Sequence, residues 1–202
     1  MADSREQDDA APAEGIDALR LETRVYEVAN RERHQRGYLP LAWDPDLVPM
    51  ARYHSRRMSD IDELYHVSPD GEGLRDRAEL FNYDVVAKAS GQAFCHECGA
   101  DLRTYQAPAH CPECSARTPY RGPTTRAGGA LGENVAFHRY GTSRLPNTDE
   151  GIVANSTVNG WLNSPEHREN LLAERFERMA IGVDVVTESD GSTRIYITQN
   201  LS

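Results

Sequence analysis

The chain has 202 residues and a mass of 22.6 kDa, the size of one domain or of one domain with a small added module. Acidic residues outnumber basic ones by 32 to 22, and a net charge of −10 disfavours generic binding to nucleic acid or to anionic membranes. No apolar run approaches the roughly 20 residues that a transmembrane helix needs, so we expect no membrane span.

The composition and the start of the chain suggest a cellular setting. Lys88 is the only lysine, and acidic excess with few lysines is typical of proteins from a high-salt cytoplasm. We therefore expect a halophilic, archaeal protein, although a GC-rich genome would also replace lysine with arginine. Met1–Gly15 has no basic cluster followed by an apolar stretch, so the sequence predicts a cytoplasmic location. A longer precursor would make an extracellular location the alternative.

Residues 1–15 are acidic with little apolar surface, which predicts a disordered tail. A first helix is predicted from Asp17 to Gly37, because glycine suits the left-handed position that ends a helix. Its apolar stripe consists of Leu21, Val25, Val28 and Ala29.

Asp44-Pro45 predicts the start of a second helix, with aspartate as N-cap and proline as the first helical residue. The stripe of this helix consists of Leu47, Ala51, His54 and Met58, so we expect His54 to pack or to make a buried hydrogen bond. A short third helix is predicted from the spacing of Leu74, Ala78 and Phe81. A fourth begins at Asp149 and carries Ile152, Val153 and Trp161.

Strand patterns are fewer and come late in the chain. Residues 132–137 form a short apolar run, and residues 180–187 and 193–201 alternate across a turn, which predicts a hairpin. Because helices come first and no β-α-β rhythm is present, the sequence predicts an α+β fold with an antiparallel sheet.

Four cysteines form two CxxC pairs, Cys95/Cys98 and Cys111/Cys114, with twelve residues between the pairs. This spacing presents four thiolates to a tetrahedral Zn²⁺ ion, which we prefer over disulfides or a redox dithiol. A closed four-thiolate site is structural, and a segment this small needs the metal to fold. Its predicted role is contact with a partner protein or shielding of a binding site.

Five motifs occur in an order that is similar to one known family. They are the segments 30–44, 54–58, 66–71, 132–134 (Gly-Glu-Asn) and 161–171, the last followed by Ile181-Gly182-Val183. Together they resemble the CAP superfamily, which comprises the cysteine-rich secretory, antigen 5 and pathogenesis-related-1 proteins, in its prokaryotic, disulfide-free form. The resemblance implies an α-β-α sandwich with a shallow cleft.

The resemblance also divides the chain. It assigns residues 16–84 and 130–202 to the CAP (SCP) domain, leaving residues 90–120 as an inserted zinc ribbon and residues 121–129 as a linker. Residues 1–15 precede the domain.

The cleft of many CAP proteins collects two histidines and two acids, and the histidines can hold a divalent ion, often zinc. Carried over by motif, His66 and His167 are the cleft histidines and Glu133 is the first acid. The second acid of the family follows the helix tryptophan by about one turn, where this chain has Asn163-Ser164. The resemblance therefore carries over three of the four polar residues of the cleft.

Three functions are compatible with these residues. The first is a binding module whose cleft takes a small ligand, a peptide or a divalent metal. The second is a metal-dependent hydrolase, peptidase-like or esterase-like, in which Glu133 acts as base beside His66 and His167. The third is a vestigial cleft with a purely structural role. The missing fourth polar residue and the absence of a GxSxG nucleophile motif favour the first.

Overall fold

The computed structural model describes residues 15–83, 113–115, 130–142 and 149–202. Its helices and strands are α1 (Ala18–Gln35), β1 (Ala42–Trp43), α2 (Val48–Ile61), α3 (Leu74–Leu80), β2 (Gly132–Tyr140), α5 (Glu150–Asn163), α6 (Pro165–Leu172), β3 (Arg178–Thr187) and β4 (Thr193–Leu201). The predicted acidic tail up to residue 14, the linker and all but residues 113–115 of the predicted zinc ribbon lie outside the described residues.

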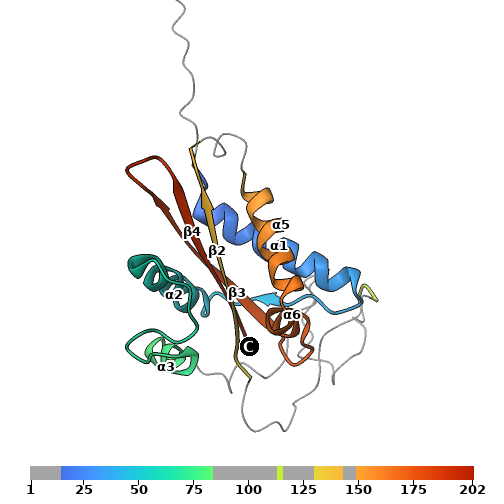
Figure 1. The fold of residues 1–202 in the computed structure, drawn as a ribbon. Coiled ribbons are helices and arrows are strands. Elements are labelled where there is room, and N and C mark those ends of the chain that lie inside the picture. The colour runs from blue at the N-terminus through green and yellow to red at the C-terminus, as the bar shows by residue number, and fades with distance from the viewer. Residues whose placement is uncertain (1–14, 84–112, 116–129, 143–148) are drawn as a thin grey trace, which may run out of the picture.

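The four strands form one sheet in the order β1-β3-β4-β2. Helices α1, α5 and α6 lie on one side of this sheet, and α2 and α3 lie on the other (Figure 1). The predicted mixed α+β class and the α-β-α layering are therefore confirmed.

The prediction of an antiparallel sheet is correct for β2, β3 and β4 but wrong for β1, which pairs parallel to β3. A residue of α1 holds the backbone just before β1 in place. The side-chain amide of Asn30 accepts from the backbone N–H of Leu41 at 2.8 Å and donates to its carbonyl oxygen at 2.9 Å. A strand of only two residues is too short to show an alternating pattern, so β1 could not be predicted from the sequence.

Alternating side chains on β3 divide the core between the two faces of the sheet. Met179, Ile181 and Val183 are buried in the cluster formed with α1 and α5, whereas Ala180 packs with residues of α2 and α3. A Cβ atom at Gly182 would lie 2.2 Å from the backbone carbonyl carbon of Ala51 in α2. Glycine at this position therefore lets α2 lie directly on the sheet.

The ends of α1 follow the sequence prediction. The side chain of Asp17 accepts a hydrogen bond from the backbone N–H of Arg20 at 2.8 Å, which caps the first turn. At the other end, Gly37 has a φ of 81°, the left-handed conformation predicted for it.

Helix α2 begins at Val48, about one turn later than predicted. Asp44 does not cap the helix, because its Oδ1 accepts from the backbone N–H of Asp46 in a preceding turn. The other oxygen, Oδ2, accepts from the hydroxyl of Tyr83 at 2.8 Å. An Asp-Pro pair favours both a turn and a helix start. Here it forms a turn, and the helix begins after that turn.

Two features near the C-terminal half differ from the sequence prediction. Residues 165–172 form α6, which the sequence analysis did not predict, and Pro165 occupies the first helical turn after Ser164. Ile152, placed on the stripe of the fourth helix, is half exposed, whereas Val153 and Trp161 are buried. The hairpin of β3 and β4 forms as predicted.

Candidate functional site

Three elements bring the predicted site residues together beside β2, an edge strand of the sheet. His66 lies in the loop between α2 and α3, Glu133 is the second residue of β2, and His167 lies on α6. The Nδ1 atom of His66 lies 3.0 Å from Oε1 of Glu133. The ring centroids of His66 and His167 are 5.9 Å apart. Residues separated by 67 and 34 positions in the sequence thus form one cluster.

The carboxylate of Glu133 is buried and uses both of its oxygens. Oε1 accepts from His66, and Oε2 accepts from Nη2 of Arg77 at 2.8 Å. Arg77, on α3, is completely buried and also donates to the carbonyl oxygen of His66 at 3.2 Å. A buried guanidinium and a buried carboxylate are tolerated together because each compensates the charge of the other.

Arg77 was not predicted from the sequence as a site residue. The residue lies three positions after Leu74 and four before Phe81, on the apolar stripe of the predicted third helix. A charged residue on a buried stripe requires a partner, and that pattern is the signal from which its role could have been inferred.

His54 is completely buried on α2, as its place on the apolar stripe predicted. Its Nε2 atom lies 2.9 Å from the carbonyl oxygen of Tyr65, so this nitrogen carries the proton. The same nitrogen lies 3.5 Å from Oε1 of Glu133. His54 therefore makes the expected buried hydrogen bond and also touches the site, holding the residue that precedes His66.

The two site histidines differ in their surroundings. The side chain of His66 is 51% exposed, and because Nδ1 faces the Glu133 carboxylate, Nδ1 carries the proton and Nε2 is left as a lone-pair donor. His167 is partly buried, and burial together with the neighbouring His66 lowers its pKa, while Glu166 opposes the shift. The His167 imidazole is accordingly neutral at pH 7.

Asparagines of two motifs fix α6 against β2. Asn134 donates to the carbonyl oxygen of His167 at 3.0 Å, and Asn170 donates to the carbonyl oxygen of Glu133 at 3.0 Å. A Cβ atom at Gly132 would lie 2.5 Å from the ring of Phe176, so the chain packs too closely there for a side chain. The Gly-Glu-Asn motif thus supplies a close approach, a carboxylate and a brace for His167.

The fourth polar position of the family has no carboxylate in this chain. Asn163 lies in the wall of a groove whose lining includes neither His66 nor His167. Glu169 forms an ion pair with Arg175 at 3.6 Å. In the described part of the chain, no group of three or more His, Cys, Asp or Glu side chains is arranged to hold a metal ion.

The predicted four-cysteine site cannot be assembled from the described residues. Cys95, Cys98 and Cys111 lie outside them, and Cys114 is exposed in the short turn at residues 113–115. The assignment of Zn²⁺ to these cysteines stays a prediction.

Acid is expected to destabilise the fold through His54. Burial lowers the pKa of His54 to about 4, below the value of about 6.5 for an unfolded histidine, so the unfolded state takes up the proton first. The free energy of unfolding should therefore fall between pH 6.5 and 4, by at most about 1.4 kcal/mol per pH unit from this residue. Urea unfolding across this range should show a weaker pH dependence in His54→Gln than in the wild type. An equal dependence would contradict the assignment.

Comparison with known proteins agrees with this arrangement. The model of the CAP family, described as the cysteine-rich secretory protein family, matches residues 26–97 and 100–201. A Bacillus subtilis (strain 168) protein named "Uncharacterized membrane protein YlbC" is 25% identical over 179 residues, which are 89% of this chain and 33% of that protein. The chain thus spans about a third of the length of that relative. No helix among the described residues is long and apolar enough to span a membrane.

Two solved structures share the fold. An extracellular protein containing an SCP domain from Bacillus anthracis superposes with a TM-score of 0.53 at 22% identity, over 91% of this chain and 40% of that one. An outer surface protein from Borrelia burgdorferi gives a TM-score of 0.52 at 18% identity, over 93% of this chain and 96% of that one. With the family model matching most of its length, the chain belongs to the CAP, or cysteine-rich secretory protein, family.

Proposed function

We propose that this CAP domain is a binding module whose site is centred on His66 and His167. The two imidazoles would hold a divalent metal ion, which in turn would recruit a polar group of a small ligand or peptide. The observation that carries the proposal is the pairing of two adjacent rings, 5.9 Å apart, with a buried carboxylate on Nδ1 of His66.

The chemistry of the donor set supports a metal ion. A carboxylate that accepts from one ring nitrogen fixes the tautomer of a histidine and makes the other nitrogen a better metal ligand. Neutral imidazole is a good ligand for Zn²⁺, and both donors come from positions that the fold holds in place. Two protein ligands leave the remaining coordination positions to water or to a bound molecule, which suits capture of a ligand.

The surroundings of Glu133 favour binding over hydrolysis. A general base must reach a water molecule and take its proton, whereas Glu133 is buried and its charge is balanced by the buried Arg77. Both oxygens of Glu133 already accept hydrogen bonds, from His66 and from Arg77, and His54 lies 3.5 Å from the first. The carboxylate is thus suited to orienting His66. Among the described residues, no other carboxylate hydrogen-bonds to His66 that could serve the hydrolase alternative as general base.

A second, structural Zn²⁺ ion belongs to the same proposal. Its ligands would be Cys95, Cys98, Cys111 and Cys114, and the support is the spacing of the two CxxC pairs. The zinc-bound segment would contact a partner protein or shield the histidine site.

The location of the protein is proposed from its relatives. The solved neighbours are named as an extracellular protein and an outer surface protein, which gives no support to the predicted cytoplasmic location. The alternative expectation, an extracellular or surface protein, is therefore the one we propose.

Zinc content of the purified protein tests both metal sites. Elemental analysis should find two equivalents in the wild type and one in His66→Ala/His167→Ala, with the loss confined to the histidine site. His34→Ala removes an exposed histidine of α1 and should keep both equivalents. One equivalent in the wild type and in the double variant alike would refute a metal ion at His66 and His167, and none in the double variant would refute the four-cysteine site.

A further inference from the structure

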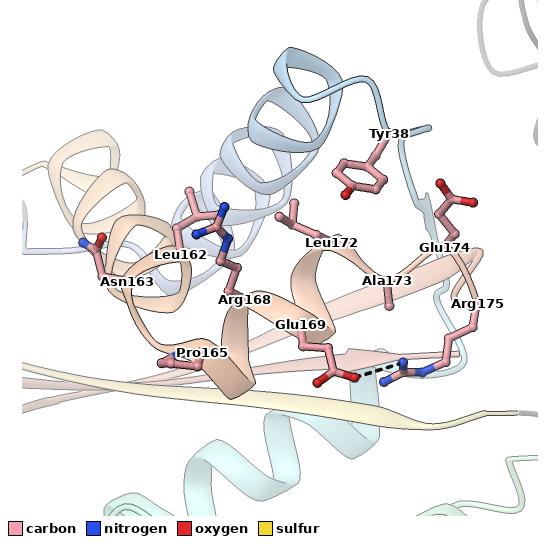
Figure 2. A pocket seen from close by; sticks show the side chains of 10 residues that line it. All are labelled: Tyr38, Leu162, Asn163, Pro165, Arg168, Glu169, Leu172, Ala173, Glu174 and Arg175. Atoms are coloured by element: carbon pink, nitrogen blue, oxygen red, sulfur yellow. Dashed lines mark ion pairs between the residues drawn. The ribbon is translucent and has the colours of Figure 1, made fainter.

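A groove of about 610 Å³ lies beside α6, and its lining includes none of the residues of the histidine site. Its walls come from Tyr38 after α1, the last turn of α5, α6, and the segment that follows α6 (Figure 2). Sites for small molecules and short peptides commonly have volumes of about 300–1,000 Å³. The groove is large enough for such a ligand.

The groove is built on a fixed base. Arg33 of α1 is buried and donates to the carbonyl oxygens of Leu39, Leu171 and Ala173, at distances of 2.8, 2.7 and 3.2 Å. These hydrogen bonds connect α1 to the segment after Tyr38 and to the end of α6, which form two walls of the groove. The guanidinium also lies 5.8 Å from the ring centroid of Tyr38. The walls are thus preorganised, which lowers the entropic cost of binding.

The charges around the groove favour a monoanion. The lining residues Arg168 and Arg175 stand against Glu169 and Glu174, and Arg33, which is buried and does not line the groove, adds a third positive charge nearby. Glu169 is paired with Arg175, and Glu174 interacts electrostatically with Arg33. Arg168 is exposed and is the remaining cation among these described residues. The two carboxylates would repel a dianion such as phosphate.

The rest of the lining is apolar, with a few hydrogen-bonding groups. Leu162 and Leu172 are partly exposed while packing against the core, and Leu172 lies between Arg168 and Tyr38 in Figure 2. Asn163 and the phenol of Tyr38 offer hydrogen bonds to amide groups. The lining therefore suits an apolar side chain next to a single carboxylate.

We propose that this groove binds the C-terminal end of a short apolar peptide. Arg168 pairs with the terminal carboxylate, Leu162 and Leu172 contact the last side chain, and Asn163 with Tyr38 bonds to the peptide backbone. The proposal is independent of metal binding at His66 and His167, because the two sets of residues do not overlap.

The peptide N-acetyl-Ala-Leu-Leu, with a free carboxylate, is the probe for a titration of ¹⁵N-labelled protein. We expect saturable shifts of amide signals in α6 and the residues after it. The C-terminal amide of the same peptide should bind about tenfold more weakly or worse, since it lacks the charged partner of Arg168. Equal binding of the acid and the amide would overturn the proposal.

Arg168→Gln should weaken the acid about tenfold and leave the amide unchanged. Arg56→Gln, which removes an exposed arginine of α2, is the matched control and should change neither. Octanoate distinguishes the source of the carboxylate: if it binds as tightly as the peptide, a simple fatty acid is the ligand and the peptide assignment is wrong. Both arginines are exposed, so thermal unfolding should confirm that the variants remain folded.

Discussion

Replacing Gly182 with alanine is expected to destabilise the domain by about 3 kcal/mol or more, because the new methyl group has no space. An added Cβ atom would lie 2.2 Å from backbone atoms of both Ala51 and Arg52. Backbone cannot rotate away as a side chain can, so α2 would have to move off the sheet. Since α2 also carries His54, the same shift would disturb the positions of Tyr65 and Glu133.

Urea unfolding of Gly182→Ala measures this effect, and Gly160→Ala provides the matched control. Gly160 is an exposed residue of α5 with no atom within 4 Å of an added Cβ. Alanine there should stabilise the protein by about 0.5–1 kcal/mol, because glycine disfavours a helix interior. Equal stability of the wild type and Gly182→Ala would show that α2 is not packed directly on β3.

Elements with strong local signals could be predicted from the sequence. The first helix has a clear apolar stripe, and it begins after Asp17 and ends before Gly37 as predicted. The hairpin of β3 and β4 was predicted because period-two alternation marks a sheet with two different faces. In these segments local propensity and tertiary packing favour the same structure.

Elements that depend on distant contacts could not be predicted. The two residues of β1 are a strand only because Arg178 and Met179 lie beside them. The eight residues of α6 show no apolar periodicity. The helix is held on β2 by the hydrogen bonds from Asn134 of β2 to His167 and from Asn170 of α6 to Glu133. In both cases the decisive partner is far away in the sequence.

The site was predicted in part, and only through the motifs. Spacing along the chain carries no information that His66, Glu133 and His167 meet, whereas the resemblance to the CAP family does. Arg77 and the contact of His54 with Glu133 were not predicted. Arg77 and His54 are buried groups whose role depends on the charge that they face. This charge, on Glu133, is known only once the packing of α2 and α3 against β2 is known.

Replacing Glu133 with glutamine is expected to weaken both the stability of the fold and its metal binding. The substitution keeps the shape of the side chain but leaves the buried guanidinium of Arg77 without its carboxylate. Loss of one partner of a buried ion pair costs about 3–5 kcal/mol. The affinity of His66 and His167 for Zn²⁺ should fall about 10–100-fold, because the carboxylate no longer orients and polarises His66. Urea unfolding and a zinc titration followed through imidazole ¹⁵N signals measure the two effects.

A control and a double variant separate the two effects of Glu133→Gln. Glu22→Gln also removes a buried carboxylate with an arginine partner, but Arg52 is 46% exposed and can be hydrated, so a smaller loss of stability and no loss of zinc affinity are expected. Glu133→Gln/Arg77→Met removes both buried charges and should recover much of the stability while zinc affinity stays low. Recovery of zinc affinity in the double variant would mean that Glu133 only stabilises the fold. Persistent weak binding in a stable protein would establish that Glu133 and Arg77 together position His66.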